Sequence, residues 1–232
     1  MKKALHLPNR HYYCLSIIFF VVLFLLISCK KNDTDNGKVV RGEAKVKLIN
    51  AAQSPSSVDF YLNDSKINSS ALAFGETSDY IKIESGTKTT TVSKDVNTLD
   101  AEAEFSYVPT LSYTTFFVED KTGKGEVLIF EDNLGAIEMG KARIKFINLS
   151  PNFTNAINIT LAGVGLLVNS LPFKEASGYF TIAPNTNIGI SVLGLEGLKI
   201  IEGSEFEAGK IYTLWVSGSS NSNLSINKIT YN

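Results

Sequence analysis

The chain is poor in the side chains on which much enzyme chemistry depends. It has two histidines, two cysteines and one tryptophan among 232 residues. Both histidines, His6 and His11, and one cysteine, Cys14, lie in the first 28 residues, so the sequence from residue 29 onward has no histidine and keeps Cys29 as its one cysteine. An imidazole base, a His/Cys zinc site and an intramolecular disulfide are therefore excluded for that part of the chain.

The first 28 residues carry the features of a secretory signal peptide. Basic residues at positions 2, 3 and 10 precede an apolar run from Leu15 to Ile27 that only Ser16 interrupts. The run is too short for the roughly 20 residues that a helix needs to cross a bilayer core about 30 Å thick. We therefore predict a signal peptide over residues 1–28.

The end of this run resembles the lipobox of bacterial lipoproteins. The residues are Leu26-Ile27-Ser28-Cys29. In lipoproteins the signal is cut before the cysteine, which then carries acyl chains, each buried CH₂ contributing about 0.8 kcal/mol to membrane binding. The resemblance implies that Cys29 is lipidated and that the protein is anchored in the cell outer membrane, on its surface or its periplasmic face. An uncleaved signal anchor with an incidental Cys29 is the alternative.

The composition after cleavage argues against nucleic acid as a partner. Loss of Lys2, Lys3 and Arg10 leaves 19 of the 22 basic residues against 23 acidic ones, with no basic block beyond Lys30-Lys31. Residues 29–41 are polar and form the predicted lipidated N-terminus and flexible tether. Within the tether, Lys31 and the following acidic residues also resemble export signals of surface lipoproteins, and a plain linker explains them equally well.

The remainder of the chain contains one unit twice. GEAKVKLIN at 42–50 matches GKARIKFIN at 140–148, and ALAFGETSDYIKI at 71–83 matches SLPFKEASGYFTI at 170–182. The two offsets, 98 and 99, differ by a single inserted residue. A repeat of this length predicts tandem domains, at 42–134 and 140–232, with a short linker between them that lets the two domains abut.

Each copy has the pattern of β-strands. Apolar and basic side chains alternate over 44–48 and again over 142–146, the period of two that is typical of a half-buried strand. Further runs rich in β-branched or aromatic residues predict strands at 58–62, 80–83, 87–92, 113–119 and 126–130, and in the second copy at 157–161, 179–182, 188–193, 212–217 and 224–231. Their short connections predict two antiparallel, immunoglobulin-like β-sandwiches, without the Cys…Trp…Cys signature of true immunoglobulin domains.

The repeated motifs resemble a bacterial envelope family known as domain of unknown function 4397. The resemblance rests on Ile147-Asn148 near a Ser-Pro, on VDFYL at 58–62, on Phe-x-x-x-Ser-x-Tyr at 74–80 and 173–179, and on a late Tyr-Thr strand. It covers both copies. No activity is established for the family, so the resemblance implies no catalytic residue.

The acidic residues offer little for catalysis or metal binding. The obvious pairs, Glu102/Glu104, Glu119/Asp120 and Glu131/Asp132, are interpreted as solvated charges at turns and edges, because a glycosidase needs two carboxylates that face each other. The acidic segments at 120–126 and 131–138 lack the alternating oxygen ligands of an EF-hand loop. We expect no catalytic site, no metal and no cofactor, and hence no enzyme.

Aromatic residues recur at equivalent positions of the two copies. Tyr80/Tyr179 and Tyr113/Tyr212 are interpreted as core residues whose hydroxyl groups reach a backbone partner. Phe116 and Trp215 fall on the opposite strand face from Tyr113 and Tyr212 and are the candidate ligand contacts, on the condition that their rings are exposed. Burial near the domain junction is the alternative.

The sequence predicts a lipid-anchored envelope protein that acts as a non-catalytic binding module for a glycan or for another envelope protein. Two alternatives fit the same sequence: a structural subunit of an envelope assembly, in which strand edges pair with partner chains, and a carboxylate-dependent hydrolase.

Overall fold

The structure is a computed structural model that describes residues 42–54, 56–95, 98–153, 156–218 and 223–231. The predicted signal peptide, the predicted lipidation site Cys29 and the predicted tether lie outside these residues. The described residues belong to one compact unit, Val40–Asn232. They form sixteen strands and one short 3-10 helix, η1 (Gly203–Glu205), and they contain no α-helix. None of them forms a helix with the length and hydropathy that a membrane crossing requires.

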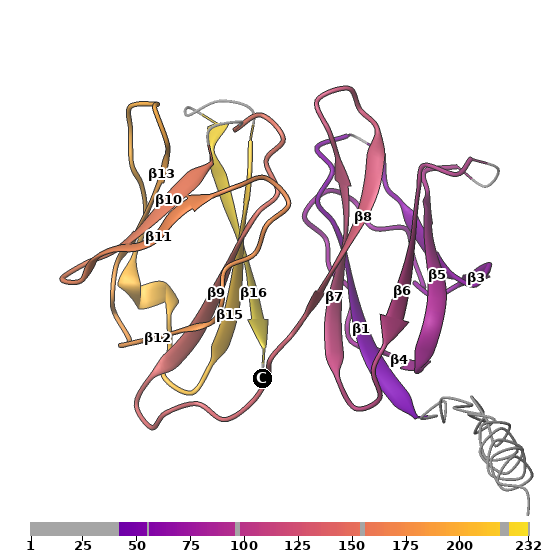
Figure 1. Ribbon diagram of the computed structural model, residues 1–232, viewed down its shortest axis with the longest axis horizontal. Helices are drawn as coiled ribbons and strands as arrows, with labels where there is room; N and C mark the ends of the chain where they lie inside the picture. Colours follow the sequence, from indigo (N-terminus) through magenta and orange to yellow (C-terminus); the bar gives the residue numbers. More distant parts are fainter. Residues whose placement is uncertain (1–41, 55, 96–97, 154–155, 219–222, 232) are drawn as a thin grey trace, which may run out of the picture. The chain divides into compact units, whose positions relative to one another are not determined.

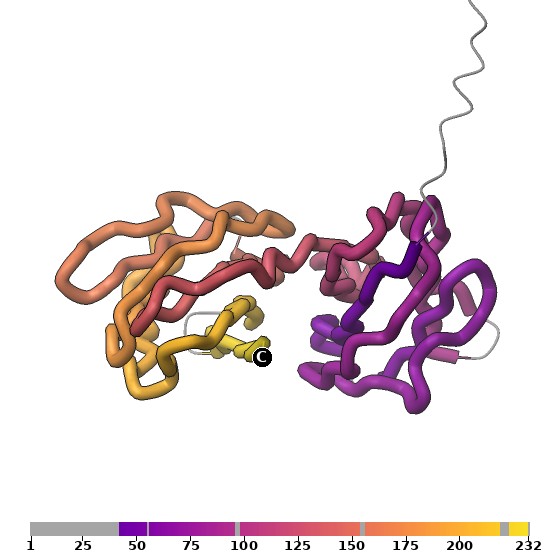
Figure 2. Tube along the Cα trace, turned by 90° about the horizontal axis from the view of Figure 1, so that it is seen from below, coloured from indigo at the N-terminus to yellow at the C-terminus, as the bar shows by residue number. Residues whose placement is uncertain are grey.

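The strands fall into two sets of eight (Figure 1). The first set consists of β1 (Glu43–Asn50), β2 (Asp59–Leu62), β3 (Ser65–Lys66), β4 (Ile81–Glu84), β5 (Gly86–Ser93), β6 (Ala101–Tyr107), β7 (Ser112–Glu119) and β8 (Gly125–Glu131). The second set consists of β9 (Ala142–Asn148), β10 (Ile157–Leu161), β11 (Gly165–Leu171), β12 (Phe180–Ile182), β13 (Ile188–Val192), β14 (Lys199–Ile201), β15 (Ile211–Ser217) and β16 (Ser225–Tyr231). The trace in Figure 2 passes once from the first set to the second.

Both sets have the same topology. In the first set the sheets run β4-β1-β7-β8 and β3-β2-β5-β6, and in the second set they run β12-β9-β15-β16 and β11-β10-β13-β14. We call the sheets that contain β1 and β9 the front sheets and the other two the outer sheets. The prediction of two β-sandwiches is confirmed. The prediction that all strands pair antiparallel is wrong. β1 pairs in parallel with β7, and β9 pairs in parallel with β15.

Each sandwich has its own apolar core between its two sheets. Side chains such as Val46, Phe60 and Tyr113 fill the first core, and Ile144, Ile159 and Tyr212 fill the second. A third apolar cluster involves the opposite faces of the front sheets, where Ile49 and Phe116 pack with Ile147 and Trp215. The front sheets are therefore buried on both faces, which explains why every residue of β15 is buried and why its sequence does not alternate.

The repeated asparagine at the end of the first strand of each set joins that strand to a distant segment. Asn50 donates from Nδ2 to the Leu72 carbonyl (2.9 Å), and its Oδ1 accepts from the Ala52 amide (3.1 Å). Asn148 makes the equivalent bonds to Leu171 and Ser150, both 3.1 Å. Both side chains are fully buried. The asparagine of the Ile-Asn motif thus provides buried hydrogen bonds, which an apolar side chain at the same position could not make.

The repeated serine and tyrosine also have structural roles. The hydroxyl oxygens of Ser78 and Ser177 each accept a hydrogen bond, at 2.9 Å, from an amide of the first strand of their set. Tyr113 accepts from the Val108 amide (3.1 Å), and Tyr212 accepts from an amide five residues upstream in the same way (2.8 Å). The prediction that these two tyrosines are core residues with backbone partners is confirmed, and the geometry is that of a tyrosine corner.

We expect Asn148→Ala to lower the free energy of unfolding by about 2–4 kcal/mol, because it leaves a buried carbonyl and a buried amide without partners. Urea denaturation measures this change. Asn169→Ala, at an exposed position on β11, is the matched control and should change stability by less than about 0.5 kcal/mol. Equal effects of the two substitutions would show that the buried asparagine is dispensable.

Candidate functional site

The two predicted ligand contacts lie where the front sheets meet. Phe116 is fully buried and Trp215 is 2 % exposed. The Trp215 ring packs edge to face against Phe116, with 6.2 Å between ring centroids, and against Phe74, at 6.0 Å. The condition for ligand contact, an exposed ring, is not met in the structure, because the front sheets cover the face of β7 and β15 from which these side chains project.

A buried polar cluster lies beside these rings, centred on the carboxylate of Asp132. One carboxylate oxygen accepts from the hydroxyl groups of Tyr80 (2.8 Å) and Thr114 (2.6 Å). The other accepts from the Tyr231 hydroxyl (3.1 Å) and from the Lys145 ammonium (3.3 Å). The Asp132 side chain is fully buried and that of Lys145 is 4 % exposed. The interpretation of Asp132 as a solvated charge is therefore wrong, whereas its neighbour Glu131 is exposed.

The cluster links the two copies through positions that are equivalent in the repeat. Asp132 directly follows β8, and Tyr231 holds the equivalent place on β16, 99 residues later. Lys145 comes from β9 and also lies over the ring of Tyr179, 5.0 Å from its centroid. The partner of the Tyr80 hydroxyl is thus a carboxylate of its own set rather than the predicted backbone group.

Burial sets the proton affinities in this cluster. Desolvation raises the pKa of Tyr80 and of Tyr231 above the ordinary tyrosine value, and the charge of Asp132 adds to the effect. Desolvation lowers the pKa of Lys145, and the attraction of Asp132 opposes this only in part. A closed, fully hydrogen-bonded carboxylate is well suited to fix the packing of the front sheets, and it presents no open face to a substrate.

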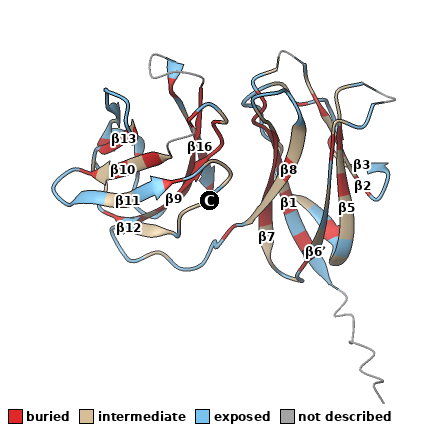
Figure 3. Ribbon diagram, turned by 45° about the horizontal axis from the view of Figure 1, so that its top comes forward, coloured by how far each residue is buried: buried red, intermediate tan, exposed pale blue. Residues whose placement is uncertain are grey.

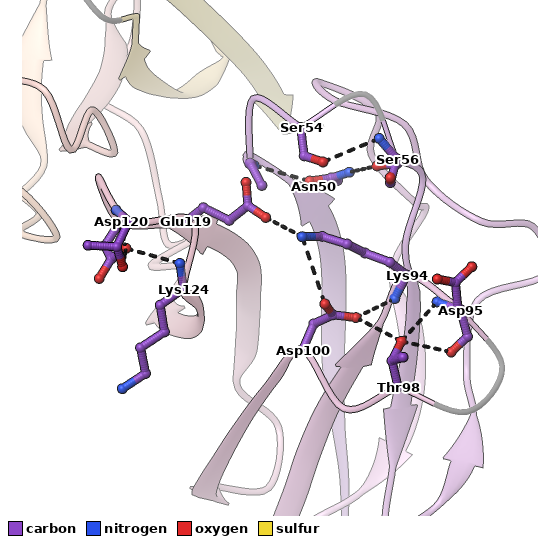
Figure 4. A network of polar contacts seen from close by, with 12 residues as sticks. Asn50, Ser54, Ser56, Lys94, Asp95, Thr98, Asp100, Glu119, Asp120 and Lys124 are labelled. Atoms are coloured by element: carbon purple, nitrogen blue, oxygen red, sulfur yellow. Dashed lines mark hydrogen bonds and ion pairs between the residues drawn. The ribbon is translucent and has the colours of Figure 1, made fainter.

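The remaining carboxylate pairs have ordinary structural roles. Glu102 and Glu104 are exposed on β6. Glu119 forms an ion pair with Lys94, whose ammonium also lies 3.8 Å from Asp100 (Figure 4). Asp120 accepts from the Thr122 amide (2.7 Å) and the Lys124 amide (3.0 Å), which closes the hairpin turn between β7 and β8. Among the described residues, no group of three or more His, Cys, Asp or Glu side chains is placed to hold a metal ion.

The outer sheets of the two sets differ in residues that face away from the cores. One row of cross-strand partners in the first set reads Lys66, Tyr61, Thr91 and Glu102. The equivalent row in the second set reads Leu166, Thr160, Gly189 and Ile200. A row that ends in Lys66 and Glu102 in one copy therefore ends in Leu166 and Ile200 in the other, and we call the two rows the polar row and the aliphatic row.

We call Leu166, Leu198 and Ile200 the aliphatic face. Leu166 is 56 %, Leu198 is 54 % and Ile200 is 52 % exposed. The Leu198 side chain lies over Gly189, since its nearest methyl carbon would stand only 2.9 Å from a Cβ added there. The second set has further exposed aliphatic residues. They are Leu193 and Leu195 in the β13–β14 connection and Val164 in the β10–β11 turn. Figure 3 shows the exposed stretch of β11 on this sheet.

A cleft of about 420 Å³ opens beside the aliphatic face, between the edge strands β14 and β16. Its lining includes Leu214 and Leu224, which belong to the core of the second sandwich, and Ile200, which belongs to the aliphatic face. Charged side chains border it: Lys199, Glu202, Glu205 and Lys228. The last two form an ion pair with each other.

These features define an all-β protein of two sandwiches that share one topology and differ in their outer surfaces. The chain belongs to the family described as domain of unknown function (DUF4397), whose match covers residues 44–160. The match begins in β1 and ends within β10, so it spans the first set and the start of the second. No curated protein matches the chain.

Several solved structures are similar to the chain, each at 9 % sequence identity. A candidate cell adhesion protein from Bacteroides uniformis has a TM-score of 0.28, and the match covers 83 % of this chain and 98 % of that one. A streptococcal virulence factor described by its alpha-glucan binding has a TM-score of 0.25, with coverage of 79 % and 96 %. A candidate cell adhesion protein from Parabacteroides distasonis has a TM-score of 0.23, with coverage of 83 % and 99 %.

We expect Asp132→Ala to lower the free energy of unfolding by about 3–5 kcal/mol, because it leaves the Lys145 ammonium buried without its counter-charge. Glu131→Ala, which removes the adjacent exposed carboxylate, is the control and should change stability little. Adding Lys145→Met to Asp132→Ala should recover part of the loss, since the buried charge is then absent. Denaturant titration of the parent and the three variants tests this. A double variant that is less stable than Asp132→Ala would argue against the buried charge as the cause.

Stability should fall as the pH rises above about 10. The unfolded chain ionises Tyr80 and Tyr231 near that pH, whereas the folded protein, in which their pKa values are raised, keeps both protons. The unfolded state then binds fewer protons than the folded state, which favours unfolding. Lys145 acts in the opposite direction, at pH values below its ordinary pKa of 10.5. Unfolding free energies at pH 9, 10 and 11 should decline less steeply above pH 10 for Tyr231→Phe than for the parent, and equal slopes would contradict the assignment.

Proposed function

We propose that this protein is a non-catalytic binding module, held at the cell envelope by acyl chains on Cys29, that binds a protein partner through the outer sheet of its second sandwich. The observation that supports binding is the contrast between the two equivalent rows: Leu166 and Ile200 stand where the first set has Lys66 and Glu102. The fold tolerates charged residues at both positions, so core packing does not require the aliphatic ones.

Exposure of the aliphatic face is unfavourable unless a partner covers it. Each Å² of apolar surface removed from water contributes roughly 25 cal/mol, and contiguous apolar patches on soluble proteins mark interaction sites. Six of the eleven large hydrophobic side chains that are exposed among the described residues lie between Val164 and Ile200. This clustering in one copy of the repeat favours a single binding surface over scattered exposure.

The chemistry of the face favours a protein over a glycan. A sugar carries hydroxyl groups that need hydrogen-bond partners when they are buried. The row of the aliphatic face offers one side-chain hydroxyl, that of Thr160, and it already donates to the Gly189 carbonyl at 3.3 Å. A glycan seated there would leave its hydroxyl groups unpaired, whereas an apolar protein surface would not.

The envelope location rests on the sequence. A charged start, a short apolar run and Ser28-Cys29 at its end together favour processing and lipidation. We expect Cys29→Ala to shift the protein from the membrane fraction of cells to the soluble fraction, as measured by immunoblotting. Retention of the variant in the membrane would favour the uncleaved anchor.

The binding surface is tested by photo-cross-linking in cells of the native host. A photoreactive phenylalanine analogue replaces Ile200 in one variant and Glu102, its equivalent in the first set, in the other. We expect a discrete protein adduct from position 200 and none from position 102, and we expect Leu166→Lys to abolish the adduct. Equal labelling from both positions, a carbohydrate adduct or no adduct would contradict protein binding at the aliphatic face.

A further inference from the structure

Two strand edges beside the cleft have no strand partner within the described part of the chain. There β14 pairs with β13 and β16 pairs with β15, and the cleft lies between their other edges. Edge strands carry rows of amide and carbonyl groups that another chain can pair with. Proteins usually cover or shorten such edges, and β14 is only three residues long.

The first sandwich has a cleft of about 460 Å³ at the equivalent place, between the start of β6 and β8. There the strand equivalent to β14 is β6, which has seven residues. β8 lies so close to the start of β6 that a Cβ on Gly125 would stand 2.6 Å from the Asp100 carbonyl oxygen and 2.6 Å from the Phe117 ring. Both clefts reach core residues, which are Ala101 and Val127 in the first sandwich and Leu214 and Leu224 in the second. The two sandwiches differ in the strand that borders the cleft, because β14 is four residues shorter than β6.

We propose that the free edge of β14 receives an extended peptide segment of the protein partner, which adds a strand to the outer sheet and fills the cleft. This inference rests on the proposed function and specifies how the partner binds. Strand addition gives affinity through main-chain hydrogen bonds, while pockets for alternate side chains give specificity. The cleft supplies such a pocket, and the aliphatic face supplies the surface for the other set of side chains.

The geometry defines the chemistry of the segment. Side chains of a strand alternate between the two faces of a sheet. In a strand paired with β14, one set of side chains would lie next to Ile200 and extend the aliphatic face. The other set would point into the cleft toward Leu214 and Leu224. The segment should therefore be apolar on both faces at its centre, β-branched or aliphatic, and free of proline.

The charged rim adds a constraint on the ends of the segment. Lys199 and Glu202 are at the two ends of the short edge, with the Glu205–Lys228 ion pair across the cleft. Charges of both signs at the rim favour a segment whose flanking residues are polar and of mixed charge.

A phage-displayed library of random 12-residue peptides, selected against the purified protein from residue 42 to 232, tests the inference. We expect selected peptides to have a β-branched or aliphatic centre, and to protect the amides of Lys199–Ile201 from hydrogen exchange. The decisive control is a synthetic copy of the best peptide with N-methyl groups on alternate central residues. It keeps every side chain but cannot donate to β14, and its affinity should be about tenfold lower or weaker still.

Three outcomes would overturn the inference. They are a selection without binders, protection of amides elsewhere than β14 and β16, and N-methylation without effect. If Leu166→Lys weakens the peptides while N-methylation does not, the aliphatic face binds without strand addition, and the proposed function survives alone. A third result separates the two proposals: β14 is protected and N-methylation lowers the affinity, but position 200 gives no cross-link in cells. The edge of β14 then binds peptides, and the proposed function is wrong.

Discussion

The packing of the two front sheets on each other depends on one buried carboxylate. Asp132 receives hydrogen bonds from both tandem copies, through Tyr80 and Thr114 on one side and Tyr231 and Lys145 on the other. An isolated charge at this depth would be strongly destabilising, so the four donors are needed together. With the front sheets so covered, the outer sheets are the broad surfaces that each sandwich leaves open to partners.

The two copies have diverged where their surfaces are open. Their shared residues, such as Asn50 and Asn148 or Tyr113 and Tyr212, make the same buried hydrogen bonds in each sandwich. On the outer sheets the first sandwich has the polar row through Thr91 where the second has the aliphatic row through Gly189, and the seven-residue β6 has its counterpart in the three-residue β14. Both changes lie in the second sandwich and adjoin each other at Ile200, which supports one binding surface with two parts.

Much of the fold could be predicted from the sequence, because period-two alternation and internal repetition are local signals. Four strands were not predicted, because their local signals are weak. β3 and β14 are too short, and β6 alternates glutamates with small residues, as in Glu102-Ala103. β11 (Gly165–Leu171) starts at a glycine and does not alternate apolar with polar residues. The role of Asp132 could not be predicted, since it depends on residues up to 99 positions away. The aliphatic row could not be predicted either, because its members come from four strands whose registers only the structure defines.

Carbene footprinting tests most directly whether a partner covers the second outer sheet. The reagent labels accessible side chains, and it is applied both to cell envelopes that contain the native protein and to the purified protein. The account predicts that labelling of Leu166, Leu198 and Ile200 falls several-fold in the envelope, while Tyr61, Lys66 and Glu102 are labelled equally in both samples. Equal labelling of the aliphatic face in both samples would contradict it.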